Sequence, residues 1–195
     1  SVDVASRVFI LDGHPGASSY CGAIASAYER GAETACREVR ILRLSAMDFD
    51  PDMRSGYGEK RELEPCLADV QEALSWCDHL VIAHPLWWGG VPAKLKGLFD
   101  RTLLPGFAYR YEKGKAFPVP LLKGRTAEVL VTSDTPGWYL RYVLRAPGFR
   151  VMRKQILEFC GFSKVRFRMF SPIHGSGEED RRQWLEKAER YGARG

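Results

Sequence analysis

Short continuous apolar runs alternate along the chain with longer segments whose apolar residues recur every three or four positions. The first pattern is typical of strands buried on both faces of a sheet, and the second of amphipathic helices. The apolar runs predict five strands, at residues 8–11, 39–44, 80–83, 127–132 and 165–170. The periodic segments predict five helices, at residues 21–36, 63–77, 92–103 and 150–160, and a last one that follows a capping-box spacing of Ser176 and Glu179.

This alternation of strands and helices predicts the class of fold. Consecutive βαβ units give a parallel sheet covered by helices on both faces. The length of 195 residues fits one domain, and no linker or repeat interrupts the chain, so we expect a single domain over residues 1–195. The least regular part is the connection from Pro105 to Lys123. A connection of that length is usually functional or packs against a partner chain.

Composition narrows the cellular context. Hydrophobic residues make up 45% and charged residues 27% of the chain, as in soluble globular proteins. No apolar run reaches the roughly 18 residues of a membrane helix, and the first residues lack the pattern of a secretory signal. The five cysteines are widely spaced, with no C-x-x-C pair. We therefore expect a cytoplasmic protein with free thiols, no metal site and no membrane insertion.

The net charge of +5 indicates an anionic partner. Nucleic acid and a small phosphorylated ligand are both compatible with a basic surface. The Lys and Arg residues are spread along the chain and form no basic tract, which disfavours nucleic acid.

In open parallel sheets, ligands bind beyond the carboxyl ends of the strands. The first loop expected there, "GHPGASSYCGAI", supplies the hydroxyls of Ser18 and Ser19 and the start of a helix, where free N–H groups attract an anion; His14 adds a donor. Taken alone, Ser18 or Ser19 is better explained as a helix cap. The loop matches neither a Rossmann nor a P-loop pattern.

The second loop, "PLWWGG", places two indoles beside two residues without side chains. Gly89 and Gly90 allow backbone amides to approach a ligand, and Trp87 and Trp88 can cover a planar ring. The alternative that the tryptophans are core residues stays open. The third loop, "TSDTPGWYLRY", offers hydroxyls and tyrosines, although by itself it also fits an ordinary Pro-Gly turn. Together, the loops suit a ligand with a phosphate at one end and a flat heterocycle at the other, as in a flavin nucleotide.

One stretch carries a family resemblance. The segment "PLWWGGVPAKLKGLFDRTLLPGFAYRY" resembles the motif of the flavodoxin-like NAD(P)H:quinone oxidoreductases, which include DT-diaphorase, the modulator of drug activity B proteins and the ancillary flavoproteins of potassium efflux systems. "GHPGASSY", "MDFDP" and "ILEFCGF" are similar to other parts of that family's sequences. The resemblance implies a flavodoxin-like, doubly wound α/β sandwich with a five-stranded parallel sheet in the order 2-1-3-4-5.

The resemblance also implies roles for particular residues. Those expected to bind the flavin are His14, Ser18, Tyr20, Cys21, Pro85, Leu86, Trp87, Trp88, Gly89, Ser133, Asp134 and Thr135. Tyr109 and Tyr111 match tyrosines that close the pocket of the partner subunit in a homodimer. Tyr139 and Tyr142 lie near positions that steady charge on the reduced flavin, and with Trp88 they form the expected catalytic set. The glycines of the family's third loop are absent here.

The implied activity is transfer of hydride from NAD(P)H through the flavin to a quinone or another planar acceptor, with one pocket used twice and ping-pong kinetics. The absence of a longer C-terminal extension favours FMN over FAD, and the basic surface favours NADPH over NADH. A regulatory flavoprotein of a potassium-efflux transporter is the main alternative. A one-electron flavodoxin carrier is disfavoured, because such carriers are typically acidic.

Overall fold

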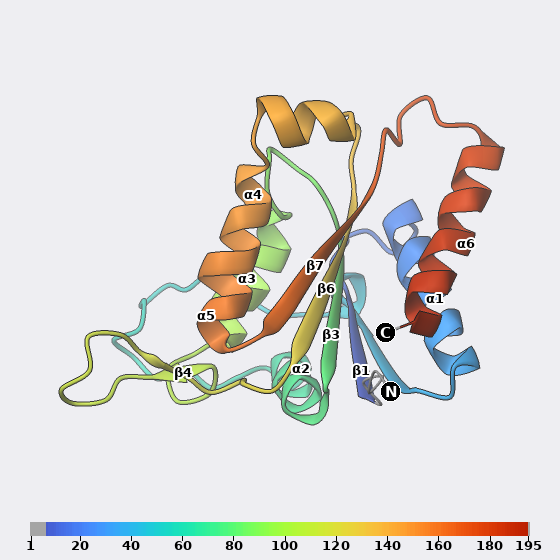
Figure 1. Ribbon diagram of the computed structural model, residues 1–195. Helices are drawn as coiled ribbons and strands as arrows, with labels where there is room; N and C mark the ends of the chain where they lie inside the picture. The colour runs from blue at the N-terminus through green and yellow to red at the C-terminus, as the bar shows by residue number, and fades with distance from the viewer. Residues whose placement is uncertain (1–6, 195) are drawn as a thin grey trace.

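Five parallel strands form the central layer of the molecule, of which the computed structural model describes residues 7–194 (Figure 1). The strands are β1 (Arg7–Asp12), β2 (Glu38–Arg43), β3 (His79–Pro85), β6 (Thr126–Thr132) and β7 (Ser163–Phe170). They pair in the order β2-β1-β3-β6-β7. Numbered among the main strands alone, this order is 2-1-3-4-5, which confirms the flavodoxin-like α/β sandwich expected from the sequence.

Helices cover both faces of this sheet. On one side lie α1 (Tyr20–Thr34) and α6 (Glu178–Arg194), and on the other α2 (Pro65–Trp76), α3 (Ala93–Thr102), α4 (Pro147–Arg150) and α5 (Glu158–Cys160) (Figure 1). Within residues 7–194, no helix is long and apolar enough to cross a membrane.

Alternation along the strands separates two apolar cores. In β1, Val8 and Ile10 pack in the core beneath α1 and α6, whereas Phe9 and Leu11 pack in the core beneath α2 and α3. Successive side chains of a strand point to opposite faces, so a strand covered on both sides is a continuous apolar run. The continuous apolar runs that predicted β1, β3 and β6 are therefore a consequence of burial on both faces.

Two glycines bring α1 and α6 into close contact. A Cβ on Gly31 would lie 1.8 Å from the Glu189 carbonyl oxygen, and one on Gly192 would lie 2.0 Å from that of Tyr28. Each helix thus has a glycine, and no side chain, at the point where the other helix comes closest. This close packing against α1 holds α6 in place over the sheet. Because the loop before α6 borders the carboxyl edge of the sheet, this packing also helps to position the candidate site.

Two predicted features of the helix ends are wrong. The helix expected over residues 21–36 ends at Thr34, and Cys36 is exposed with φ +57° instead of continuing the apolar stripe. The capping box of Ser176 and Glu179 does not form. The Ser176 hydroxyl donates to the Ile173 carbonyl (2.6 Å), and Glu179 pairs with Arg182 (2.6 Å). At that helix start, a bond back to the preceding loop and an i,i+3 ion pair replace the expected cap.

The helix predicted over residues 150–160 begins earlier, at Pro147, and contains widened π-type turns over η3 (Val151–Leu157). A further π-type turn, η2 (Tyr139–Val143), was not predicted. Its Leu144 N–H donates to the Tyr139 carbonyl five residues earlier (3.0 Å). Such turns do not follow the periodicity of an α-helix, so the apolar pattern of this segment predicts a loop.

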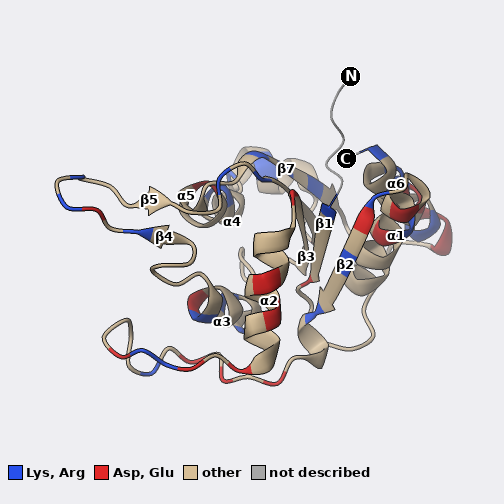
Figure 2. Ribbon diagram, turned by 90° about the horizontal axis from the view of Figure 1, so that it is seen from below, with Lys and Arg blue, Asp and Glu red and all other residues tan. Residues whose placement is uncertain are grey.

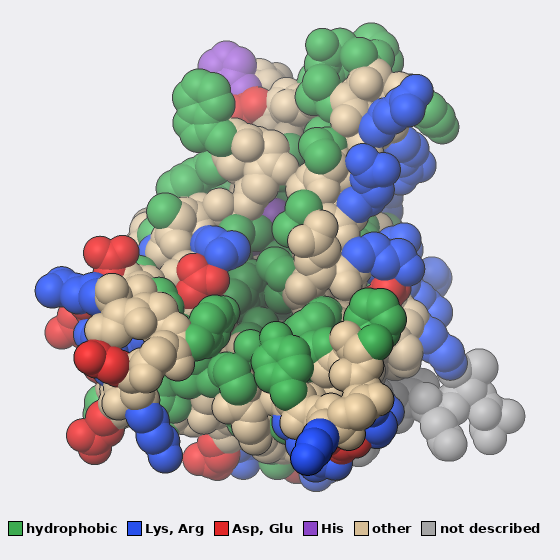
Figure 3. Space-filling view, turned by 90° about the vertical axis from the view of Figure 1, so that its left-hand side faces the viewer, with side chains coloured by type: hydrophobic (Ala, Val, Ile, Leu, Met, Phe, Trp, Pro, Cys, Tyr) green, Lys and Arg blue, Asp and Glu red, His purple; other side chains and the backbone are tan. Residues whose placement is uncertain are grey.

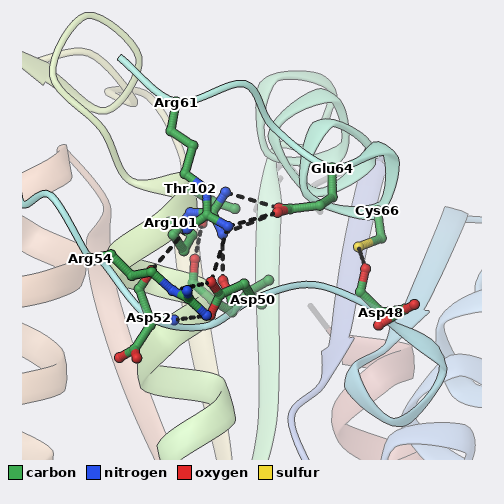
Figure 4. A network of polar contacts seen from close by, with 10 residues as sticks. Asp48, Asp50, Asp52, Arg54, Arg61, Glu64, Cys66, Arg101 and Thr102 are labelled. Atoms are coloured by element: carbon green, nitrogen blue, oxygen red, sulfur yellow. Dashed lines mark hydrogen bonds and ion pairs between the residues drawn. The ribbon is translucent and has the colours of Figure 1, made fainter. Parts of the chain in front are cut away.

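The long connection after α3 forms a hairpin of β4 (Tyr109–Arg110) and β5 (Val119–Pro120), outside the main sheet. It projects on the same side of the molecule as the charged segment 50–63 (Figure 2). That segment is held by Arg101 of α3, whose side chain is only 2% exposed and whose guanidinium binds the Glu64 carboxylate (2.9 Å) and the Asp50 carbonyl (Figure 4). The carboxylate of Asp50 pairs in turn with Arg54 (2.8 Å) and Arg61 (3.1 Å).

Candidate functional site

The candidate site lies where β1 and β3 end side by side. From β1 the chain order proceeds to β2 on one side and to β3 on the other, so the switch in strand order falls between these two strands. The loops that follow them meet at this point: the rings of His14 and Trp87 contact edge to face, with centroids 5.5 Å apart and planes at 80°. The first and second predicted loops are thus in direct contact.

The first loop leads into the N-terminus of α1. The Ser19 hydroxyl accepts a hydrogen bond from the Gly22 N–H (2.9 Å), so Ser19 is a helix cap, whereas Ser18 is exposed at the mouth of the loop. No acidic residue lies in the first turn of α1. The nearby carboxylate of Asp12 is buried and paired with Arg43 (2.8 Å). The free N–H groups at this helix end are therefore available to an anion.

His14 has a fixed orientation in this loop. Its ring Nδ1 accepts a hydrogen bond from the Gly16 N–H (2.9 Å), and the backbone N–H of His14 donates to the Asp12 carboxylate (3.2 Å). With Nδ1 acting as acceptor, the neutral imidazole carries its proton on Nε2. That nitrogen is then the donor that His14 can offer to a ligand.

Tyr20 and Cys21, both expected to bind the flavin, pack partly and fully into the protein interior, respectively. The Tyr20 hydroxyl donates to the Arg181 carbonyl of α6 (2.7 Å), and burial raises the pKa of this phenol to about 12, against an opposing effect of Arg181. Cys21 is buried, and burial together with the nearby Asp12 raises the pKa of its thiol. Both side chains stay protonated near neutral pH, so Cys21 is no thiolate nucleophile.

The second loop is a two-residue turn. Trp87 and Gly90 exchange backbone hydrogen bonds of 2.9 and 3.0 Å, and the central residues Trp88 and Gly89 have φ of +50° and +76°. Positive φ at both central positions is typical of type I′ turns, which favour Gly and Asn. Trp88 is fully exposed, so the alternative that it is a core residue is wrong; Trp87 is 45% exposed. A bulky residue in a strained, exposed position indicates a role other than packing.

The third loop is tied to the strand that follows it in the sheet. The Ser133 hydroxyl accepts from the Thr135 N–H (3.0 Å), and the Asp134 carboxylate accepts from the His174 N–H (2.7 Å). The Ser133 carbonyl accepts from the Ile173 N–H (3.0 Å). The loop is thus ordered by side-chain turns where the family's pattern has glycines.

The three loops enclose a cavity of about 310 Å³ at the carboxyl edge of the sheet. Nine of the predicted cofactor-binding residues line it, namely His14, Ser18, Tyr20, Cys21, Pro85, Leu86, Trp87, Ser133 and Asp134. Ser19, which the sequence offered as either an anion ligand or a helix cap, also lines the cavity, and Thr132 and Ile173 complete the lining without having been predicted as site residues. Ile173 follows β7, and the rule that ligands bind beyond strand ends could have drawn attention to it. Nothing in its local sequence did so.

The other predicted site residues lie outside this lining. Trp88 and Thr135 directly follow the lining residues Trp87 and Asp134 in the chain, and Gly89 follows Trp88. Tyr139 and Tyr142 lie on the η2 turn, where Tyr142 is 74% exposed. Tyr109 packs against Phe159 of its own chain (5.2 Å between centroids), and Tyr111 is exposed. The roles of these residues in catalysis and across a dimer interface stay predictions.

A larger cavity, about 770 Å³, lies between segments 53–63 and 104–107. Among its charged wall residues, Arg101 is paired with Glu64, and Arg54 and Arg61 with Asp50; no main-sheet strand ends in this cavity. It offers neither the helix N-terminus nor the bare turn of the smaller cavity. We therefore assign the candidate site to the smaller cavity despite its size.

Comparison with known proteins agrees with this arrangement. A family model described as a flavodoxin-like fold matches residues 6–194. The chain belongs to this flavodoxin-like family. The resemblance to flavodoxin-like NAD(P)H:quinone oxidoreductases, first seen in the motif after β3, is thereby confirmed.

Three relatives illustrate the range of this flavodoxin-like protein's similarities. An "Uncharacterized NAD(P)H oxidoreductase" of Haemophilus influenzae is 28% identical over 184 residues, covering 92% of this chain and 90% of its own. An "FMN-dependent NADH:quinone oxidoreductase 1" of Bradyrhizobium diazoefficiens is 28% identical over 141 residues, covering 72% of this chain and 64% of its own. The structure of an NAD(P)H:quinone oxidoreductase from Methanothermobacter marburgensis superposes with a TM-score of 0.81, at 25% identity, over 98% of this chain and 99% of that one.

The site residues fit a flavin mononucleotide. The start of α1 can receive a phosphate, because its first turn holds no acidic residue and the nearby Asp12 carboxylate is paired with Arg43. Around Gly89 and Gly90 there is open space, since a Cβ built on either would meet no atom within 4 Å. A planar ring could therefore approach the backbone of this turn beside Trp87.

Proposed function

We propose that this protein is an FMN-dependent NAD(P)H oxidoreductase that reduces quinones or similar planar acceptors. The observation that carries the proposal is the meeting of an anion-binding helix start and an exposed aromatic turn at one cavity, through the contact of His14 with Trp87. When bound, the flavin supplies the redox chemistry, accepting hydride from NAD(P)H and returning electrons to the acceptor.

The chain's own residues bind and orient in this proposal. The N–H groups at the start of α1 and the Ser18 hydroxyl hold the phosphate. Trp87, braced by His14, lies along one edge of the ring system. The N–H groups of Trp88 and Gly89, unlike those of Trp87 and Gly90, are not used within the turn, and at the ring they would favour added negative charge. Trp88 covers the mouth, and its exposed indole stacks on flat substrates.

Two observations favour a reductase with a shared substrate pocket. The cavity is open to solvent above the turn, and the aromatic residues around it are exposed, so the same face is accessible first to a nicotinamide and then to an acceptor. This arrangement predicts ping-pong kinetics. The preference for NADPH over NADH rests only on the surplus of positive charge.

The test begins with the purified protein. We expect a yellow preparation that releases FMN on heating, identified by mass, and anaerobic bleaching by NADPH that is reversed by a naphthoquinone. Initial rates at several quinone concentrations should give parallel double-reciprocal lines. A protein that stays colourless after incubation with FMN and with FAD would refute the proposal. Bleaching without quinone turnover would refute the reductase assignment and leave the flavin site.

A further inference from the structure

The surplus positive charge of the protein is concentrated in one segment. Residues 135–157, here called the basic segment, contain five Lys or Arg residues and no Asp or Glu. Of the chain's 29 basic residues the other 24 equal its 24 acidic residues in number, so the basic segment accounts for the whole net charge of +5.

Three of these five charges have no partner among the residues that the structure describes. Within residues 7–194, the guanidinium groups of Arg141, Arg145 and Arg150 form no hydrogen bond or ion pair, and all three side chains are exposed. Lys154, by contrast, pairs with Glu158 (2.7 Å), and Arg153 lies over the ring of Phe167 (5.2 Å). The unpartnered charges thus belong to the outer part of the segment.

Apolar side chains project among these arginines. Residues 141–145 are exposed at every position, and Val143 and Leu144 are 53% and 47% exposed. Trp138 and Tyr142 are exposed beside them. The segment crosses the top of the molecule above the carboxyl ends of the strands (Figure 1), and Figure 3 shows hydrophobic side chains there with Lys and Arg side chains directly beside them.

The apolar residues do not collapse onto the domain because the turn that carries them is anchored from below. Leu140 is buried, and Gly148 fits so tightly that a Cβ on it would lie 2.0 Å from the Gly89 carbonyl oxygen. Arg145 and Ala146, between these anchors, have φ of +59° and +43°. A strained reversal at this point keeps the turn raised from the surface.

We propose that the basic segment docks the protein on the surface of an anionic phospholipid bilayer. Aliphatic and aromatic side chains surrounded by arginines are the composition of interfacial membrane anchors: the apolar groups enter the headgroup region and the guanidinium groups bind lipid phosphates. A second copy of the same segment is a poor occupant, since it would oppose like charges. A nucleic acid could bind the arginines through its phosphates, but it would offer no apolar surface against which Val143 and Leu144 could be buried.

Docking in this orientation turns the carboxyl edge of the sheet toward the bilayer. If the proposed reductase activity holds, a quinone dissolved in the membrane would reach the site without crossing bulk water. Vesicle binding itself needs no redox activity, so the docking proposal and the proposed function fail independently.

The test is cosedimentation with sucrose-loaded vesicles of phosphatidylcholine containing 30 mol% phosphatidylglycerol, compared with pure phosphatidylcholine. We expect binding to the anionic vesicles that weakens in high salt. Arg141→Gln/Arg145→Gln should lower the partition coefficient by roughly 30-fold, and Val143→Ser/Leu144→Ser by about tenfold or more. Lys60→Gln/Arg190→Gln removes two equally exposed charges elsewhere and should have little effect.

Four outcomes would overturn the proposal. The first is no binding of the wild-type protein to anionic vesicles at low salt. The second is an equal loss of binding in the control pair, which would indicate diffuse electrostatics. Tight binding to duplex DNA without vesicle binding is the third. The fourth is that Val143→Ser/Leu144→Ser converts a dimer to a monomer in light scattering, because the patch would then be a subunit interface. Circular dichroism verifies that each variant folds, and since all substituted side chains are exposed we expect that they do.

Discussion

Gly148 and Gly89 form a backbone contact that leaves no space for a side chain: a Cβ on Gly148 would lie 2.0 Å from the Gly89 carbonyl oxygen. The contact joins the start of α4 to the turn that borders the candidate flavin site. Whatever moves α4 therefore moves this turn, because both partners are main chain and cannot change rotamer.

This contact predicts the effect of adding one methyl group. Gly148→Ala should cost about 1–3 kcal/mol of unfolding free energy, because the clash requires a backbone shift. It should also weaken FMN binding, since the turn is displaced. Gly137→Ala is the control: its Cβ would meet atoms only at 3.6 and 3.7 Å, so the change should stay within about 0.5 kcal/mol. Urea titration and fluorescence-monitored FMN titration measure both effects; equal behaviour of the two variants would contradict the prediction.

The strained conformation of Trp88 leads to a second prediction. Trp88→Asn should leave the melting temperature unchanged or slightly higher, because Asn tolerates positive φ and the indole buries nothing. Quinone turnover should fall about tenfold or more if the indole stacks on substrate. Trp88→Phe, which keeps an aromatic ring, should retain most of the activity. Thermal melts measure the stability of the variants and steady-state kinetics their quinone turnover. Full activity of Trp88→Asn would show that Trp88 does not contact the substrate.

Arg101 is predicted to anchor segment 50–63. Arg101→Ala leaves Glu64 without its buried partner and the Asp50 carbonyl without its donor, which should cost roughly 3–5 kcal/mol of unfolding free energy. Trypsin should then cleave faster at Arg54 and Arg61, because the segment loosens. Lys96→Ala removes an exposed ion pair on the same helix, with Asp100 (2.7 Å), and should change stability by less than about 0.5 kcal/mol. Intact proteolytic resistance in Arg101→Ala would show that other contacts hold the segment.

His79 should make the fold sensitive to mild acid. Burial, with help from Arg37 and Arg166, lowers the pKa of His79 to about 3. The unfolded chain, with a His pKa near 6.5, therefore binds a proton that the native state does not, and stability decreases as pH falls below about 6.5. The resulting loss between pH 6.5 and pH 5 is about 1.5 kcal/mol.

The matched variant for this prediction is His79→Gln, whose amide can replace hydrogen bonds to Tyr28 (3.2 Å) and Thr126 (2.7 Å) without titrating. Its stability should decline less between pH 6.5 and pH 5 than that of the wild type. Glu128, 3.9 Å from His79, acts in the opposite direction because burial raises its pKa, but it is present in both proteins. Parallel pH profiles from urea unfolding would contradict the assignment.

Local sequence was informative wherever burial on both faces imposed a pattern. The run Val8–Leu11 predicted β1, and the motif from Pro85 to Arg101 predicted the loop and helix after β3, because both are continuous in the chain. The cap predicted at Ser176 is wrong, because the Ser176 hydroxyl donates to the Ile173 carbonyl of the preceding loop. This bond depends on how that loop folds, which the local sequence pattern does not specify. The η2 turn was missed because a π-type turn depends on the anchors at its ends, not on a repeat.

The sequence by itself determined the five strands and the loops that carry the candidate chemistry through apolar periodicity, and one continuous motif implied the strand order through a family resemblance. Tertiary structure alone decided that His14 meets Trp87, that Trp88 is exposed rather than buried, and that Arg141, Arg145 and Arg150 are exposed near Val143 and Leu144. The physical reason is that strand register and helix packing bring distant loops together, and these contacts leave no periodic trace in the chain.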